Sequence, residues 1–306
     1  MKQNAWRAVV AAAVVVGVAG CGSGRPAGPD TGGAPAIGPI PVVLTVSAIN
    51  RPIDAYLPSV ASVKALITAV DAVTARCMKQ YGLPFDPAAP IGLDDLNQQD
   101  KMRSPLYGFF DPDAARANGY EVSAGMPAAA TPGQGQAELS PAAIAVLGGR
   151  DASGNPATSY AGRPVPAGGC QQQGVDAVGG YPPRPDAQAL PDHGPVVPTA
   201  DPRMRAVDTA WSACMKSRGF DYANPAAALA DPQWAPKGAG NQPPTAKEVA
   251  TVTADLDCKR STNLMGVAVA VETAYDQQYI ASHRTQLAAY TQQLQARVGQ
   301  AAHLVG

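Results

Sequence analysis

The longest regular pattern of apolar positions lies near the end of the chain. Apolar residues recur at helical and near-heptad spacing from Val249 to Val298, and no proline interrupts them. The preceding segment Thr-Ala-Lys-Glu (245–248) has the form of a helix-capping box. The pattern predicts one very long helix or two helices in succession, with a bend at 259–263, where the apolar face is weakest.

Two further helices have clear boundaries in the sequence. One follows Pro58, carries apolar residues mostly three and four positions apart, and stops at Gly82. The other is capped by Asp201 and ends at Gly219. Because a long helix gains most of its stability from tertiary packing, we expect both helices to pack against the C-terminal one.

The other segments carry weaker signals. A capping residue followed by proline predicts short helices at 111–119, at 140–149 and from Asn224. The β-branched residues at 41–46 predict a short strand or an extended lead-in. Residues 151–200 show almost no periodicity and many glycines and prolines, so we expect a connector there. The chain is therefore predicted to be mainly α-helical, with extensive Gly/Pro-rich loops.

The N-terminus has the features of an export signal. Lys2 and Arg7 precede a short apolar run that ends in Val-Ala-Gly-Cys, and this run is too short to span a bilayer as a stable helix. The ending resembles the bacterial lipobox, which implies removal of the signal peptide, residues 1–20, and attachment of lipid to Cys21. The alternative is an ordinary secretory signal that happens to end in cysteine. Residues 21–40, rich in Gly and Pro, then predict a flexible tether to a body formed by 41–306.

The cysteine count predicts two disulfides. Five cysteines occur, and four remain if Cys21 carries lipid. An even number in an exported protein indicates paired cysteines, but four allow three connectivities and the count alone does not choose among them.

A short repeat offers one way to choose a connectivity. The segments CMKQYG (77–82) and CMKSRG (214–219) agree at four of six positions. If each half of the chain follows one plan, the bridges are Cys77–Cys170 and Cys214–Cys258, and 55–170 and 201–306 are related halves. The alternative is coincidence in an alanine-rich chain. In either case the methionine beside each cysteine is expected to fill the core.

Composition excludes some function classes. The 306-residue chain has a formal net charge of −1, so it lacks the basic footprint of a nucleic-acid-binding protein. Aromatic residues make up only 6% of the chain, which argues against a platform for stacking bases or sugars.

Catalytic motifs are also missing from the sequence. It contains no Gly-x-Ser-x-Gly turn, no Ser-x-x-Lys motif, no zinc-binding His-Glu-x-x-His and no Cys-x-x-Cys pair. Carboxylates do occur in pairs, at Asp94-Asp95, Asp111/Asp113 and Asp255/Asp257. Such close neighbours do not face each other across a cleft as glycosidase chemistry requires. We therefore expect caps and solvated faces at these pairs, and we expect neither a metal nor a cofactor.

Several longer segments carry a resemblance to a protein family. They are YGFFDPDAARANGY, VPAGGC, WSACMKSRGFDYANP, DPQW and EVATVTADLDCKRSTNL. Together they resemble a group of uncharacterised secreted lipoproteins of streptomycete-type Actinobacteria with paired Cys-Met helix motifs. The resemblance covers about residues 55–285. It implies export, lipid anchoring, a mostly helical body and paired cysteines, and it implies no activity.

These observations favour a lipid-anchored protein on the extracytoplasmic face of the cell membrane. We expect a non-enzymatic accessory or binding component of a cell-envelope or transporter complex. It would have a membrane or envelope protein as partner and would act through the apolar stripe at 264–298 and the loops at 151–200 and 225–244. The alternatives are a cell-envelope hydrolase with an unrecognised site and a small-solute-binding lipoprotein. A pocket holding titratable groups with shifted pKa would separate these alternatives from a docking surface.

Overall fold

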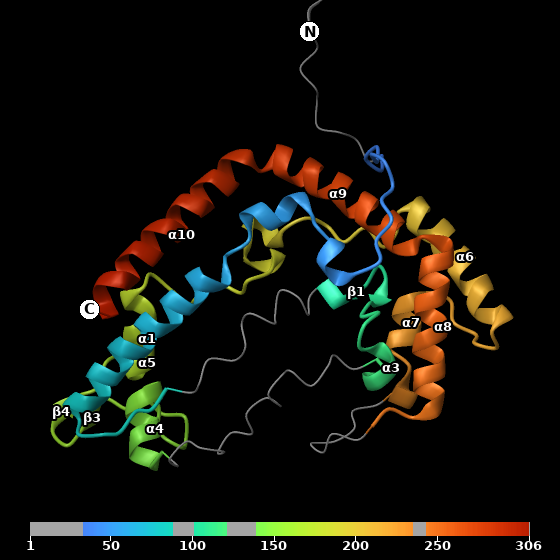
Figure 1. The fold of residues 1–306 in the computed structure, drawn as a ribbon. Coiled ribbons are helices and arrows are strands. Elements are labelled where there is room, and N and C mark those ends of the chain that lie inside the picture. The colour runs from blue at the N-terminus through green and yellow to red at the C-terminus, as the bar shows by residue number, and fades with distance from the viewer. Residues whose placement is uncertain (1–32, 88–100, 121–138, 235–242, 306) are drawn as a thin grey trace, which may run out of the picture. The chain divides into compact units, whose positions relative to one another are not determined.

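The fold is mainly α-helical, as the sequence predicts (Figure 1). The structure is a computed structural model that describes residues 33–87, 101–120, 139–234 and 243–305. From Pro35 onward the chain forms one compact unit. The α-helices are α1 (Val60–Gln80), α3 (Ala115–Asn118), α4 (Pro141–Gly148), α5 (Gly169–Ala177), α6 (Pro202–Ser217), α7 (Pro225–Leu229), α8 (Ala246–Thr262), α9 (Leu264–Ser282) and α10 (Arg284–Val305).

Short elements connect these helices. Two antiparallel hairpins pair β1 (Arg103–Ser104) with β2 (Gly108–Phe109) and β3 (Ser159–Tyr160) with β4 (Arg163–Pro164). The 3₁₀ helices are η1 (Val46–Ala48), η2 (Pro52–Tyr56), η3 (Ala187–Ala189), η4 (Pro191–His193) and η5 (Pro232–Trp234).

The long apolar pattern at the C-terminus forms three successive helices, α8, α9 and α10 (Figure 1). The first break falls at Asn263, whose backbone is left-handed with φ 51°, and it lies inside the predicted bend at 259–263. The second break, at His283, is not predicted from the sequence. There the Ser282 hydroxyl lies 3.1 Å from the Gln278 carbonyl oxygen and 3.0 Å from that of Tyr279. Such side-chain bonds to the preceding turn compete with helix geometry and bend helices.

The two helices that end in Cys-Met-Lys pack against the C-terminal helices, as expected. Helix α1 lies against α5 and α10, and α6 lies against α8 and α9 (Figure 1). The Cys77–Cys170 bridge joins α1 to α5 with a Cα–Cα distance of 5.5 Å, and Cys214–Cys258 joins α6 to α8 at 5.7 Å. Both predicted bridges are therefore confirmed.

The two Cys-Met-Lys segments also end their helices in the same way. The amide of Gly82 donates to the carbonyl of Lys79, and the amide of Gly219 donates to that of Lys216. Both glycines have positive φ, 69° and 87°, the conformation in which glycine commonly terminates helices. The repeat is thus a repeated helix end held by a disulfide. The relationship between the halves 55–170 and 201–306 stays a prediction.

The prediction that 151–200 forms only a connector is wrong for helix α5. This helix follows Gly168, which offers no side-chain cap. Its Gly174 lies so close to α1 that a Cβ there would be 2.6 Å from the Val70 carbonyl oxygen. The helix depends on that close packing and on the Cys170 bridge. Neither leaves a periodic signal in the local sequence.

Two of the three predicted short helices have the expected caps. Ser140 and Asn224 accept hydrogen bonds from the first turns of α4 and α7. The third is shorter than predicted. Asp111 Oδ1 accepts from the Ala114 amide at 3.0 Å, but α3 begins only at Ala115.

The segment that leads into the body is extended. Residues 41–44 have no regular secondary structure, which matches the extended alternative for 41–46. The Pro35 carbonyl accepts from Arg203 Nη1 at 2.8 Å, so the last residues of the predicted 21–40 tether contact the compact unit. The predicted signal peptide at 1–20 and the lipidation site Cys21 lie outside the described residues.

A fully buried ion pair lies in the core between α8, α6 and β2. Lys259 Nζ donates to Asp255 Oδ2 at 2.8 Å and to the carbonyl of Phe109, and Asp255 Oδ1 accepts from Trp211 Nε1 at 3.0 Å. Burial raises the pKa of Asp255 and lowers the pKa of Lys259, and each group opposes the shift of the other. The expectation of a solvated Asp255 is therefore wrong, because Lys259 on the next turn supplies a buried partner.

One stretch of the described chain, Pro52–Gln80, is long and apolar enough to cross a membrane by length and composition alone, with a mean hydropathy of 1.3. The core helix of a soluble protein passes the same test. Leu66, Ala69 and Met78 in this stretch are completely buried within the protein. One face of this stretch therefore packs against the rest of the protein.

Removing the Cys77–Cys170 bridge is expected to cost more stability than removing Cys214–Cys258, because the two bridges close loops of 93 and 44 residues. Loop entropy gives about 4.7 and about 4.0 kcal/mol, respectively. Guanidinium unfolding of the two Cys→Ser double variants of the full chain measures both losses. A larger loss from the shorter loop would contradict the loop-length explanation.

Candidate functional site

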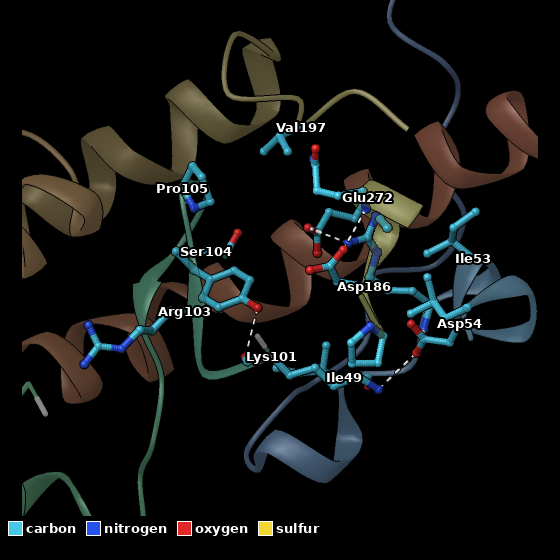
Figure 2. A pocket seen from close by; sticks show the side chains of 16 residues that line it. Ile49, Ile53, Asp54, Lys101, Arg103, Ser104, Pro105, Asp186, Val197 and Glu272 are labelled. Atoms are coloured by element: carbon cyan, nitrogen blue, oxygen red, sulfur yellow. Dashed lines mark hydrogen bonds and ion pairs between the residues drawn. The ribbon is translucent and has the colours of Figure 1, made fainter. Parts of the chain in front are cut away.

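A cavity of about 270 Å³ lies where four parts of the chain meet (Figure 2). Its volume is just below the roughly 300–1,000 Å³ typical of small-molecule sites, so it suits a small ligand. The walls come from η2 and the residues before it, from β1 and its turn, from the η3 region and from α9. The lining residues are Ile49, Arg51, Ile53, Asp54, Leu57, Lys101, Arg103, Ser104, Pro105, Tyr107, Pro185, Asp186, Ala187, Gln188, Val197 and Glu272.

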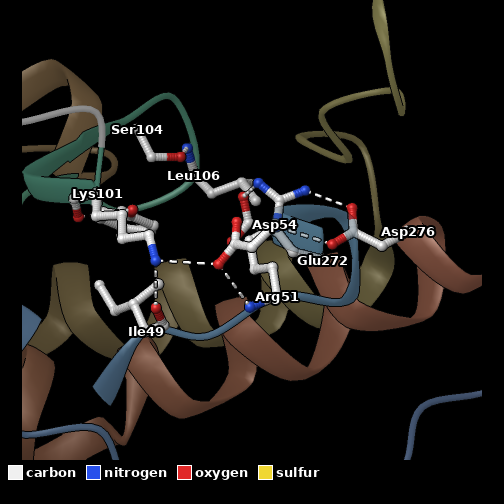
Figure 3. A network of polar contacts seen from close by, with 9 residues as sticks. Ile49, Arg51, Asp54, Lys101, Ser104, Leu106, Glu272 and Asp276 are labelled. Atoms are coloured by element: carbon white, nitrogen blue, oxygen red, sulfur yellow. Dashed lines mark hydrogen bonds and ion pairs between the residues drawn. The ribbon is translucent and has the colours of Figure 1, made fainter. Parts of the chain in front are cut away.

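The Arg51 guanidinium lies at the centre of a polar network beside this cavity (Figure 3). Its Nε and Nη2 donate to the two oxygens of Asp276, at 3.0 and 2.5 Å, and its Nη1 lies 3.2 Å from Glu272 Oε1. Burial alone would lower the pKa of Arg51, but the carboxylates of Glu272 and Asp276 raise it above its ordinary value. Arg51 therefore stays charged and holds η2 against α9.

Asp54 forms the second part of the network (Figure 3). Its Oδ2 accepts from the Arg51 amide at 3.1 Å and from Lys101 Nζ at 3.0 Å. Lys101 Nζ also donates to the Ile49 carbonyl at 3.0 Å. The network therefore contains three carboxylates and two cations. Through Lys101, a segment about fifty positions after Ile49 and Asp54 in the sequence joins the same wall.

The local sequence explains why Arg51 and Asp54 face the same space. Pro52 is the first residue of η2, and the Asp54 side chain accepts a hydrogen bond from the Arg51 amide. Ile53, between them, is 1% exposed and packs with Leu190 and its apolar neighbours. Burial of Ile53 therefore fixes the turn that presents the two charged side chains.

Glu272 is the least satisfied polar group in the wall. It is 4% exposed, and its Oε2 is buried without a hydrogen-bond partner, although Oε1 pairs with Arg51. Burial raises the pKa of Glu272 to about 7, the Arg51 charge opposes this shift, and Asp276 adds to it. A buried oxygen without a partner carries a desolvation penalty of about 1–3 kcal/mol.

Much of the rest of the wall consists of aliphatic side chains and prolines. Ile49 and Ile53 are each 1% exposed, and Pro105 and Pro185 restrict the backbone. Val197, which is 47% exposed, also lines the cavity. The site thus combines an aliphatic surface with one buried carboxylate, an arrangement that suits a small amphipathic molecule.

The charges of the network suit binding better than acid–base chemistry. Two-carboxylate hydrolysis needs one group that donates a proton and a second that activates water or attacks. Asp276 is held by two bonds from Arg51, and Asp54 is held by Lys101 and the Arg51 amide. Among these three carboxylates, the buried oxygen without a hydrogen-bond partner belongs to Glu272.

A row of Ser282, His283 and Asp192 looks at first like a catalytic triad. The Ser282 hydroxyl lies 2.9 Å from His283 Nδ1, and His283 Nε2 lies 3.1 Å from Asp192 Oδ2. However, His283 Nδ1 also lies 2.9 Å from the Tyr279 carbonyl, which accepts but cannot donate. A hydrogen on Nδ1 satisfies that carbonyl and prevents Nδ1 from acting as a base for Ser282. The row stabilises the α9–α10 junction.

The site residues predicted from the sequence lie elsewhere. Cys77, Cys170, Cys214 and Cys258 form the two disulfides and do not line the cavity. Cys21 lies outside the described residues. Within the part of the chain that the structure describes, no group of three or more His, Cys, Asp or Glu side chains could hold a metal ion.

The residues that form the cavity were missed at the sequence level. A usable signal did exist in α9, where Glu272 and Asp276, four residues apart, interrupt an otherwise apolar stretch. Acidic residues on a helix face that must be buried require a partner. The partner Arg51 is 225 residues from Asp276 in the sequence, and no local pattern indicates it.

Comparisons of the chain with family models, with curated proteins and with solved structures give no significant match.

The raised pKa of Glu272 predicts a defined pH dependence of stability. The folded group binds its proton more tightly than the unfolded group, with pKa values of about 7 and 4.5. The contribution of Glu272 to the free energy of unfolding is fully present below pH 4.5. It falls by up to roughly 3 kcal/mol as the pH rises to about 7. Glu272→Gln removes this loss. Urea unfolding at pH 5 and 8 should therefore show the variant gaining stability relative to the wild type at the higher pH.

Asp208→Asn is the matched control for this measurement. Asp208 is a half-buried carboxyl on α6 whose pKa burial raises to about 6, and it is not part of the Arg51 network. The loss of unfolding free energy that Asp208 causes with rising pH should be complete by about pH 6, whereas the loss caused by Glu272 should continue to about pH 7. If the free energies of unfolding of wild type and Glu272→Gln change in parallel between pH 5 and 8, the raised pKa of Glu272 is contradicted.

Proposed function

We propose that this chain is a lipid-anchored binding protein on the outer face of the cytoplasmic membrane, and that it holds a small solute in the cavity beside Glu272. One observation carries the proposal: a buried carboxylate oxygen without a partner lies in the wall of a partly open cavity that also has aliphatic walls. Small-molecule sites combine such apolar walls with a few fixed polar groups.

The proposed location rests on the N-terminal segment and the disulfides. The Val-Ala-Gly-Cys sequence ending at Cys21 resembles a lipobox. The two disulfides suit an oxidising compartment outside the cytoplasm. We further propose membership of the actinobacterial lipoprotein group that the sequence resembles, with a transporter or envelope complex as the partner that receives the solute.

The cavity replaces the helical stripe as the proposed binding element. The sequence suggested that the apolar stripe at 264–298 contacts a partner. Leu264, Val271 and Leu287 in this stripe are completely buried inside the chain's own core. An apolar position that already packs internally cannot also dock a partner without unfolding, so the stripe is not proposed as an interface.

Cys21→Ala should release the protein from the membrane. Without the thiol no thioether can form, and the processed chain loses its acyl chains, which provide stable anchoring. Fractionation of cells that express the full chain, with immunodetection in membranes and medium, measures the release. Ser23→Ala is the matched control and should stay in the membrane fraction. Retention of the Cys21→Ala variant in membranes would count against lipid anchoring through this residue.

Val197→Trp should block solute binding by filling part of the cavity. The probes are three four-carbon compounds, n-butylammonium, butyrate and n-butanol, each titrated into the full-length chain in detergent and followed by ligand-observed NMR. At least one should bind the wild type, and the variant should weaken that binding at least about five-fold, a loss equal to about 1 kcal/mol.

Val196→Trp is the matched control for the blocking variant. Val196 is 74% exposed and does not line the cavity, so its replacement adds the same indole without filling the site. The control should bind as the wild type does. The proposed function fails if no probe binds the wild type, or if Val197→Trp binds as tightly as Val196→Trp.

A further inference from the structure

We infer that the ligand of this cavity is a small organic ammonium ion with a short aliphatic body, bound through the carboxylate of Glu272. The inference rests on the proposed function, since it assumes that the cavity holds a solute. It adds the charge and the chemical class of that solute, and each follows from how the polar groups around the cavity are already engaged.

Within the Arg51 network, the carboxylates outnumber the cations by one. Arg103 donates to the Tyr120 carbonyl at 2.6 Å and lies over the Phe109 ring, and Figure 2 shows its guanidinium directed away from the other charged groups. Asp186 pairs with Arg184 at 2.5 Å. The remaining groups are the cations Arg51 and Lys101 and the carboxylates Asp54, Glu272 and Asp276. A cationic ligand balances this set.

An anionic ligand would have to compete for the two cations of the network, whose donors already bond within the protein. Arg51 uses Nε and Nη2 on Asp276 and directs Nη1 at Glu272 (Figure 3). Lys101 Nζ donates to Asp54 and to the Ile49 carbonyl. A carboxylate or phosphate would have to displace these bonds and would then lie beside the charge of Glu272. Like charges at close range in a poorly solvated site repel each other.

Glu272 provides the acceptor that an ammonium group needs. Its Oε2 is the carboxylate oxygen of this wall that is buried without a hydrogen-bond partner. The terminal torsion of a glutamate side chain is soft, so a small rotation turns Oε2 toward the cavity while Oε1 stays near Arg51. An N–H donor from the ligand removes the desolvation penalty and forms a charge-assisted hydrogen bond, about twice as strong as a neutral one.

The aliphatic wall defines the rest of the ligand. Ile49, Ile53, Leu57, Pro105 and Val197 offer carbon surfaces to a body of a few methylene groups. A volume of about 270 Å³ does not fit a large polycation or a peptide segment. A primary amine with a short carbon chain matches both the carboxylate and these walls.

The same three probes test the inference in the full-length chain. We expect n-butylammonium to bind the wild type more tightly than butyrate or n-butanol. Glu272→Gln should weaken n-butylammonium binding about ten-fold or more, because it removes a charge-assisted hydrogen bond, and should leave n-butanol binding within about two-fold. Asp208→Asn, which removes a carboxylate that does not line the cavity, is the control and should not change the binding of any probe.

The outcomes separate this inference from the proposed function. Tighter binding of butyrate or n-butanol than of n-butylammonium overturns the inference and leaves solute binding intact. So does equal n-butylammonium binding by wild type and Glu272→Gln. Binding of none of the probes to the wild type overturns both. If Glu272→Gln does not fold, Glu272→Asp, which keeps the charge and shortens the reach, should still bind n-butylammonium more weakly than the wild type.

Discussion

The Arg51 guanidinium is the interaction on which both the fold and the candidate site depend. It lies before η2 and bonds to Glu272 and Asp276 of α9, which are more than 200 positions later in the chain. The cation compensates two carboxylates that α9 places against the interior. Without Arg51 those charges would be buried uncompensated, and breaking such a pair costs about 3–5 kcal/mol. The same bonds fix the wall of the cavity, so its geometry is tied to the fold.

A second buried network shows what a purely structural arrangement looks like. Lys259 and Asp255 are both completely buried, and each uses its polar atoms on close partners, including the Trp211 indole and the Phe109 carbonyl. No ligand could reach this pair. Glu272 differs on both counts, because it lines a cavity and keeps one oxygen without a partner. The contrast between a satisfied and an unsatisfied network is the basis for placing the binding site at Glu272.

The sequence predicts elements whose signals are local and misses those that depend on contacts. Capping residues and terminal glycines predict helix α6 and the C-terminal end of α1. The repeated Cys-Met-Lys segment indicates the disulfide pairing. Helix α5 is missed because its stability comes from the approach of Gly174 to α1. The cavity is missed for a similar reason. Its charged residues come from 51–54, 101 and 272–276, and only the folded chain brings them together.

Stability alone does not explain the network around Arg51. Replacing a buried ion pair by well-packed apolar residues is often neutral or stabilising, by about 1–4 kcal/mol. An unsatisfied Glu272 oxygen and a raised pKa make this network still less favourable for stability at neutral pH. A ligand that donates to Glu272 changes this balance, because it binds the folded state and not the unfolded one. In the proposed complex, the hydrogen bond that the fold leaves unmade at Glu272 is the bond that the ammonium group of the solute would complete.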